Sequence, residues 1–282
     1  MNNSLPKFAY YSHHKCASTW TNSILREICF HLGWRHRTAH GTEQYGLEGG
    51  LRPWVEKNNV EFLAYTNAEI DEAQTLPPHR GFHVVRDPRD VLVSAYFSHK
   101  YSHGIWPELR DHRRSLQSLT KEDGLLKEIE FSRQFLIPMR DWDYDQDHIL
   151  EVKMETLTAQ PRDQFQSVFD HLGLKLTEEG LITRARQKVN RVVYALHHRI
   201  HKALLPSQIT MEKELHSDVW VSILKDHAFE KLSGGRSKGE EDPESHYRKG
   251  EPGDWKNHFT DRVEKKFKKV YGNIVQKLGY EK

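Results

Sequence analysis

Three stretches of the sequence place cationic and hydroxyl side chains at spacings that suit an anionic ligand. The first, "SHHKCASTWTNSIL" (Ser12–Leu25), sets Lys15, Ser18 and Thr19 between an apolar segment and an amphipathic one. If a strand ends near Ser12 and a helix begins near Thr19, the turn presents backbone N–H groups and the positive end of a helix to a phosphate. The same residues would also suit a surface turn with a solvated lysine.

This stretch does not carry the GxxxxGK[ST] pattern of a loop that binds a nucleoside triphosphate. A different phosphorylated ligand is therefore indicated. The cysteines and histidines around His13 and His14 do not have the spacing of a zinc site. We therefore expect these two histidines at the surface, and we predict no metal.

The second stretch, "VVRDPRDVLVSAYFSHK" (Val84–Lys100), brings an arginine and a serine to one edge of a predicted sheet. Arg86 would stand at the carboxyl end of a strand, and Ser94 follows about two helical turns later. A guanidinium binds phosphate through two parallel hydrogen bonds, which suits this pair to a phosphate group. A structural ion pair between Arg86 and Asp87 or Asp90 is the alternative.

The third stretch, "YRKGEPGDWKNHF" (Tyr247–Phe259), forms a compact basic loop. Arg248 and Lys249 supply two charges, and Gly250 allows the backbone to approach an anion closely. The loop belongs to a longer segment, 233–255, that is dense in glycine, proline and charge and is therefore predicted to be irregular.

The elements that must position these stretches alternate between strand and helix. Four short segments rich in aromatic and β-branched residues are predicted strands: Lys7–Ser12, Glu61–Thr66, Gly81–Asp87 and His148–Met154. Apolar residues at helical spacing predict helices from Trp20 to Leu32, from Phe165 to Leu172 and, without interruption, from Phe259 to Leu278. Residues 190–225 also have a helical pattern, without an evident chemical role. This alternation predicts a single α/β domain, with a mostly parallel sheet flanked by helices and ligands at the carboxyl ends of the strands.

Bulk properties limit the class of protein further. The chain has 282 residues and a formal net charge of +2, whereas a nucleic-acid-binding domain is usually strongly basic. Two cysteines, Cys16 and Cys29, are too few for a disulfide framework. The sequence shows neither a signal-peptide pattern nor an apolar run approaching about 18 residues. We therefore expect a cytoplasmic protein without a nucleic-acid partner or an integral membrane segment.

Taken together, the three stretches resemble the motifs of the cytosolic-type sulfotransferases, which use 3′-phosphoadenosine 5′-phosphosulfate (PAPS). "HKCASTW" is similar to the family's PKSGTTW loop, "RDPRDVLVSAY" to its 3′-phosphate motif, and "RKGEPGDWKNHFT" to its RKGxxGDWKNxFT signature. A weaker similarity joins "FEKL" at Phe229 to the family's FxxM segment. The resemblance extends from residue 14 to residue 260. It implies one sulfotransferase domain over residues 1–282 with a fold like that of P-loop kinases.

The resemblance implies a role for each matching residue. Those expected at the 5′-phosphosulfate end are Lys15, Cys16, Ala17, Ser18, Thr19 and Trp20. Those expected at the 3′-phosphate are Arg86, Ser94, Arg248, Lys249 and Gly250, with Phe229 at the adenine. Lys15 would also be catalytic, because it could neutralise the leaving phosphate. The product would be 3′-phosphoadenosine 5′-phosphate (PAP), and no metal would be required. Segment 233–255 would cover the nucleotide, and segment 190–225 would form a helical lid or part of the acceptor side.

The chain departs from the family pattern at the residue that accepts a proton. The KTH segment that supplies the family's catalytic histidine aligns with "YTN" (Tyr65–Asn67), and asparagine cannot act as a general base. Other candidates are His99, His40, Glu43, Glu69 and Asp71. We favour His99 because its surroundings, "YFSHKYSHGIW", are rich in aromatic and histidine residues that could line an acceptor pocket.

Two further departures concern adenine binding and assembly. Met154 replaces a tyrosine that stacks on adenine in the family. The dimerisation segment KxxxTVxxxE aligns with Lys256–Lys265, where Asp261 and Lys265 differ from it. The sequence therefore leaves the oligomeric state open.

The favoured function is transfer of a sulfuryl group from PAPS to a hydroxyl of a small molecule, lipid or sugar. Two alternatives remain at this point. Loss of the family's histidine would also suit a PAPS- or PAP-binding module without turnover, and the architecture would suit a phosphotransferase related to P-loop kinases.

Overall fold

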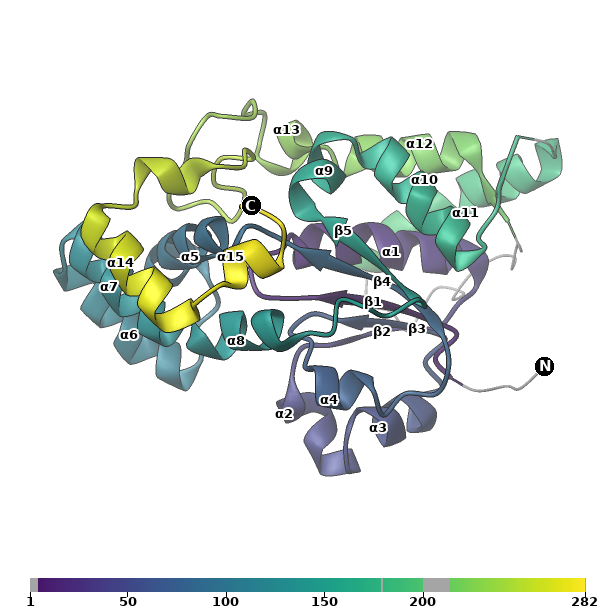
Figure 1. Ribbon diagram of the computed structural model, residues 1–282. Helices are drawn as coiled ribbons and strands as arrows, with labels where there is room; N and C mark the ends of the chain where they lie inside the picture. The colour runs from purple at the N-terminus through teal and green to yellow at the C-terminus, as the bar shows by residue number, and fades with distance from the viewer. Residues whose placement is uncertain (1–4, 179, 200–213, 282) are drawn as a thin grey trace.

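A five-stranded parallel sheet of order β2-β3-β1-β4-β5 forms the centre of the molecule (Figure 1). The computed structural model describes residues 5–178, 180–199 and 214–281. The strands of the sheet are β1 (Phe8–Ser12), β2 (His36–Ala39), β3 (Phe62–Tyr65), β4 (Arg80–Val85) and β5 (Ile149–Lys153). Two short strands, β6 (Leu176–Thr177) and β7 (Leu215–His216), pair separately. The expected parallel α/β architecture is confirmed.

The helices form three groups. Those that follow the first three strands are α1 (Ser18–Leu32), α2 (Thr42–Tyr45), η1 (Gly46–Glu48), α3 (Leu51–Lys57) and α4 (Ile70–Ala73). Those between β4 and β5 are α5 (Pro88–Phe97), the π-helix η2 (Ser98–Ser102), α6 (Pro107–Ser118), α7 (Lys121–Phe131) and α8 (Arg133–Asp141). Those after β5 are α9 (Met154–Ala159), α10 (Pro161–Leu172), α11 (Leu181–Arg199), α12 (Ser217–Asp226), α13 (Phe229–Leu232), η3 (Asp254–Asn257), α14 (Asp261–Tyr271) and α15 (Ile274–Lys277).

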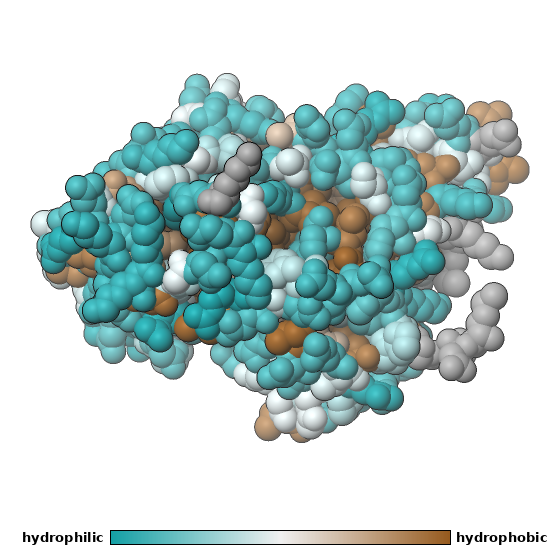
Figure 2. Space-filling view, viewed as in Figure 1, coloured by the Kyte–Doolittle hydropathy of each residue, from teal (hydrophilic) through white to brown (hydrophobic). Residues whose placement is uncertain are grey.

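Each face of the sheet is buried against a different group of helices, as Figure 1 shows. Because side chains alternate along a strand, Tyr10 of β1 joins the core formed with α1, α10 and α12, whereas Tyr11 joins the core formed with α3. A third core joins α5, α7, α14 and α15 beside the end of β4. Figure 2 shows that the face viewed in Figure 1 is largely hydrophilic, with apolar side chains gathered mainly near its centre.

One strand of the main sheet, β2, is not among the predicted strands. Its residues, His36–Ala39, include no run of apolar side chains. The strand exists because it pairs in parallel with β3, from His36 opposite Phe62 to Ala39 opposite Tyr65. Tertiary pairing therefore overrides a weak local preference.

The predicted uninterrupted C-terminal helix is wrong. Thr260 accepts a hydrogen bond from the Val263 N–H and begins α14, which leaves Phe259 outside the helix. Gly272, with φ 60°, ends α14, and the short α15 follows. The predicted helical segment 190–225 contains the end of α11 and most of α12, but Leu215–His216 form the short strand β7 instead of a helix. Residues 200–213 lie outside the described residues.

No helix in the described ranges has both the length and the hydropathy needed to cross a bilayer. Residues 233–253 follow α13 without a helix or strand, which agrees with most of the irregular segment expected there, and η3 begins at Asp254.

Candidate active site

The turn between β1 and α1 has a strained backbone. Lys15 and Ala17 adopt left-handed conformations, with φ of 62° and 57°, which residues other than glycine adopt infrequently. Ala17 is the N-cap of α1 and makes no side-chain capping bond. The first N–H groups of α1 have no acceptor within the helix and can therefore point at an anion. Strain of this kind is typical of ligand-binding turns.

Replacing Ala17 with glycine is expected to stabilise the fold by about 0.5–1 kcal/mol. A left-handed conformation costs a residue with a Cβ about 1–2 kcal/mol, and the greater freedom of glycine in the unfolded chain offsets part of that gain. Chemical denaturation measures the difference. Ser23→Gly is the matched control, because Ser23 lies inside α1 and its replacement is expected to destabilise the fold. Equal losses of stability in both variants would contradict the argument.

One large pocket collects side chains from all three motifs. Those that line it include Lys15, Ala17, Ser18, Thr19, Trp20, Arg86, Ser94, Phe229, Arg248, Lys249 and Gly250. The structure therefore brings together every residue predicted to bind a cofactor except Cys16. Cys16 is fully buried, packs in the core with α5 and α14, and donates its thiol hydrogen to the His14 carbonyl at 3.6 Å.

The second motif is attached to the first by Arg86. This residue follows β4, and its guanidinium donates a hydrogen bond to the Lys15 carbonyl at 3.1 Å. Arg86 is buried, yet it lines the pocket together with Ser94 of α5. The alternative ion pair forms elsewhere, because Arg89 is the residue that binds Asp87, at 2.7 Å.

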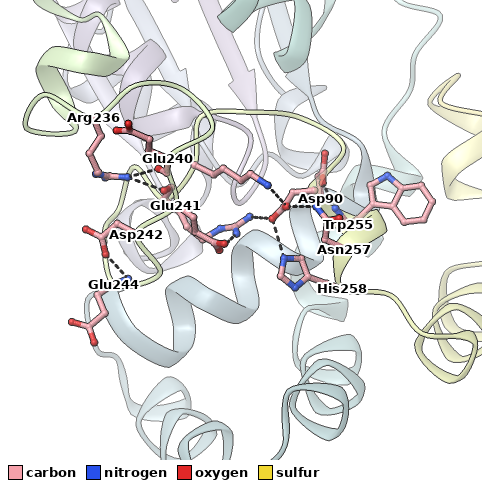
Figure 3. Close-up of polar contacts among 12 residues, drawn as sticks. Asp90, Arg236, Glu240, Glu241, Asp242, Glu244, Trp255, Asn257 and His258 are labelled. Atoms are coloured by element: carbon pink, nitrogen blue, oxygen red, sulfur yellow. Dashed lines mark hydrogen bonds and ion pairs between the residues drawn. The ribbon is translucent and has the colours of Figure 1, made fainter.

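The third motif is held in place by two buried carboxylates. Asp254 accepts hydrogen bonds from Arg248 and Lys249, both at 2.6 Å. Asp90 of α5 accepts the backbone N–H groups of Gly253 and Trp255 at 2.6 and 2.9 Å, and Figure 3 shows Asp90 beside Trp255. The turn is thereby fixed to α5, so the second and third motifs face the same pocket.

Segment 233–255 is cross-linked by its own hydrogen bonds. Arg236, shown beside Glu240 in Figure 3, donates to the carbonyls of Glu240, Tyr247 and Arg248 at 2.7–3.0 Å. The Gly239 N–H donates to the Lys249 carbonyl at 2.8 Å. The segment therefore has a defined shape, and its residues 246–252 line the pocket.

Gly250 is packed against the ring of Phe229. A Cβ at this position would lie 2.7 Å from Phe229 Cε2, and the backbone has φ 74°. Gly250→Ala is expected to lose about 1–2 kcal/mol of stability through the left-handed backbone. It should also weaken PAP binding about tenfold by displacing the ring, which is within the range for one base–aromatic contact.

Gly253→Ala is the matched control for this prediction. Gly253 has φ 80°, but a Cβ there would meet nothing within 4 Å. Thermal denaturation should show similar losses in the two variants, whereas calorimetry with PAP should distinguish them. Equal PAP affinities would mean that Phe229 does not contact the nucleotide.

The comparisons with known proteins agree with this geometry. The model of the sulfotransferase domain family matches residues 78–194 and 208–279. This chain belongs to the sulfotransferase domain family. Sulfotransferase 2A2 of Rattus norvegicus is 26% identical over 239 residues, which cover 78% of this chain and 68% of the rat protein. Cytosolic sulfotransferase 5 of Arabidopsis thaliana is 27% identical over 135 residues, which cover 48% of this chain and 33% of the plant protein.

A solved relative has the same fold. The crystal structure of mouse sulfotransferase SULT7A1 complexed with PAP superposes with a TM-score of 0.54 at 11% identity. The match covers 96% of this chain and 84% of the mouse chain. This sulfotransferase therefore has the expected P-loop-like fold.

Positive charge is concentrated around Lys15 of the sulfotransferase. Burial, followed by the charges of Arg86 and Arg248, lowers the pKa of Lys15 to about 8. Burial would raise the pKa of Asp254, but its hydrogen bonds to Lys249, Asn257 and Arg248 outweigh that effect and lower it. Asp254 therefore stays ionised and keeps the two cations of the third motif in place.

The residues considered as the base lie in different places. His40, Glu43, Glu69 and Asp71 are not among the described residues that line the pocket. Asn67, at the position of the family's histidine, donates to the His40 carbonyl at 2.7 Å. His99 is fully buried in η2 and also does not line the pocket. An acceptor in this pocket therefore would not reach His99, and its predicted role as the catalytic base needs correction.

Sequence reasoning missed three histidines that do line the pocket, His14, His103 and His246. His13 and His14 were expected at the surface, but both are buried, with exposed fractions of 1% and 9%. The signal available in the sequence was the place of His14 directly before Lys15, in the turn predicted to bind a phosphate.

Proposed function

We propose that this sulfotransferase transfers the sulfuryl group of PAPS to a hydroxyl of a small-molecule, lipid or sugar acceptor. The observation that carries the proposal is the convergence of the three motifs on one pocket, with Lys15, Arg86, Arg248 and Lys249 in its lining. The crystallised mouse relative was complexed with PAP, the nucleotide that such a reaction would release.

The residues fit the two ends of this nucleotide. The strained turn and the first N–H groups of α1 would hold the 5′-phosphosulfate, together with Ser18 and Thr19. The second and third motifs would hold the 3′-phosphate, because a guanidinium binds phosphate bidentately. Leu224 of α12 lines the same pocket as Phe229 of α13, so we expect α12 to lie beside the nucleotide. We therefore place segment 233–255 over the nucleotide and keep the acceptor side for the region around His14.

The reaction is an in-line displacement. The acceptor oxygen attacks sulfur, and the bond from sulfur to the bridging phosphate oxygen breaks. The electron pair stays on that oxygen, where Lys15 would neutralise the charge that develops. Interactions that strengthen in the transition state raise the rate of the chemical step.

The decisive test is PAP release and sulfuryl transfer from labelled PAPS with a panel of alcohols, phenols and sugars. Transfer to a hydroxyl supports the proposal. Tight PAP binding without transfer to any acceptor would assign the chain as a binding module, and tighter binding of ATP than of PAP would favour a phosphotransferase. Cys16 and Cys29 are free thiols, which agrees with the cytoplasmic location that we propose.

A further inference from the structure

His14 connects the pocket to a buried chain of polar side chains. It lines the pocket directly before Lys15, and its ring stacks on Phe135 with a centroid distance of 4.2 Å. On its other side, His14 Nε2 lies 3.1 Å from His99 Nε2. Nδ1 of His14 makes no hydrogen bond with any residue that the structure describes. One ring nitrogen is therefore engaged in the interior while the other remains available.

The chain of polar side chains continues from His99 to the buried carboxylate of Glu128. Nδ1 of His99 lies 2.9 Å from Glu128 Oε1, and Nε2 of His112 lies 2.7 Å from Glu128 Oε2. Ser132 donates to Glu128 Oε1 at 2.5 Å. Glu128 and His99 are both fully buried. Every partner of Glu128 in this chain can donate a hydrogen bond to it, as a buried carboxylate requires.

The same side chains have the ligand types of a metal site, but their geometry is that of hydrogen bonds. His99, His112 and Glu128 place one ligand atom each within 4.8 Å of one another. Each imidazole nitrogen contacts a different oxygen of Glu128, at 2.9 and 2.7 Å. Two ligands about 2.0–2.2 Å from a tetrahedral zinc would stand farther apart than this. The group is therefore a hydrogen-bonded chain.

The donors and acceptors in the chain determine which nitrogens carry hydrogen. Burial would raise the pKa of Glu128, but its contacts with His99 and His112 outweigh that effect and lower the pKa. Since the carboxylate only accepts, His99 donates from Nδ1. For this pair of imidazoles to take up a proton from the pocket, Nε2 of His99 must accept and Nε2 of His14 must donate. Nδ1 of His14 is left with a free lone pair.

We propose that His14 is the general base of this sulfotransferase, and that His99 and Glu128 are positioning residues behind it. As the acceptor oxygen bonds to sulfur, its O–H bond breaks and the proton moves to His14 Nδ1. Nε2 of His14 then passes its proton to His99 Nε2, and the resulting imidazolium is paired with Glu128. The proton finally returns to solvent through the pocket. This inference rests on the proposed function and replaces the role first assigned to His99.

His14 needs the hydrogen-bonded side chains behind it in order to act as a base. Burial, followed by His99, Lys15, His103 and His246, lowers the pKa of His14 well below its usual value. His14 is therefore neutral at neutral pH and able to accept a proton, but alone it would hold one weakly. A buried carboxylate stabilises the imidazolium that forms one hydrogen bond away, as the aspartate of a serine protease does.

The other histidines of the pocket lack such a connection. Nδ1 of His103 lies 2.9 Å from the Gly104 carbonyl, which makes it a donor there. Burial, followed by Lys15 and His103, lowers the pKa of His246 to about 4. Neither makes a hydrogen bond to a carboxylate of the described residues, so each is a matched control for His14.

The first test compares His14→Asn with His103→Asn and His246→Asn in the full chain. The rate of a single turnover from PAPS is measured with phenol and with 4-nitrophenol, at a pH where only 4-nitrophenol is ionised. A general base contributes about 10²–10⁴-fold, so His14→Asn is expected to lose that factor with phenol and far less with 4-nitrophenol. Calorimetry with PAP should show unchanged affinity. Equal losses with both phenols, or a larger loss with phenol in a control variant, would overturn the proposal.

The second test separates a positioning role from a structural one. Glu128→Gln should lower the rate with phenol and move the pH at which that rate rises. Ser132→Ala removes a hydrogen bond to the same carboxylate but keeps its charge, so it should leave the pH profile in place. Identical profiles for the wild type and Glu128→Gln would overturn the role of Glu128.

A third measurement does not depend on activity. Long-range ¹⁵N–¹H correlation spectra of the PAP-bound protein report which nitrogen of His14 carries hydrogen. We expect hydrogen on Nε2, and hydrogen on Nδ1 would overturn the inference. Absence of transfer by the wild type, with PAP bound, would instead refute the proposed function, so the two failures are distinguishable.

Discussion

Lys15→Ala is expected to lower kcat by about 10²–10³-fold, the loss typical for removal of one preorganised donor to a developing negative charge. Lys15 lies beside Arg86 in the turn where the leaving phosphate would bind. The substitution should not destabilise the fold, because alanine keeps the same left-handed backbone requirement and a partly desolvated charge is removed. Single-turnover kinetics from PAPS, with denaturation as the companion measurement, checks both expectations.

The pH dependence of kcat/KM should show whether the positive charge of Lys15 is what accelerates the reaction. The pKa of Lys15 is lowered to about 8, so the ammonium group loses its proton as pH rises through that value. Since kcat/KM reports ionisations of the free enzyme, kcat/KM for PAPS should fall above about pH 8. Lys15→Ala should lack this limb of the profile, whereas Lys15→Arg should keep its charge throughout. A wild-type kcat in Lys15→Ala would show that another group neutralises the leaving oxygen.

Arg86→Gln is expected to weaken PAP binding by about 10–150-fold, which corresponds to the 1.5–3 kcal/mol of a hydrogen bond to a charged group. The reason is the position of Arg86 in the pocket beside Ser94, where the 3′-phosphate would lie. AMP has no 3′-phosphate, so its affinity should change little. Calorimetry with both nucleotides measures the difference.

The AMP measurement also serves as the internal control. Arg86 donates to the Lys15 carbonyl and thereby supports the turn between β1 and α1. A disturbed turn would weaken both nucleotides alike, and that outcome would assign Arg86 a structural role. Ser94→Ala removes a neutral hydroxyl and should reduce PAP affinity less, by about 0.5–1.5 kcal/mol.

Much of the fold could be predicted because its signals are local. The four predicted strands correspond to β1, β3, β4 and β5, and each is a short apolar segment with clear ends. β2 was missed because its pairing partner, rather than its composition, makes it a strand. The helix from Phe259 to Leu278 was predicted without interruption because its apolar spacing continues across Gly272, where the backbone turns with φ 60°.

The sequence by itself determined the three motifs and therefore the family, because each motif is a run of neighbouring residues whose spacing is visible along the chain. Only the tertiary structure decided which histidines line the pocket. His14 and His99 are 85 residues apart, and His99 and Glu128 are 29 residues apart. No local pattern reports a contact between such positions, since burial and hydrogen bonding depend on how β1, η2 and α7 pack. The same packing buries His99 and places His14 in the lining of the pocket.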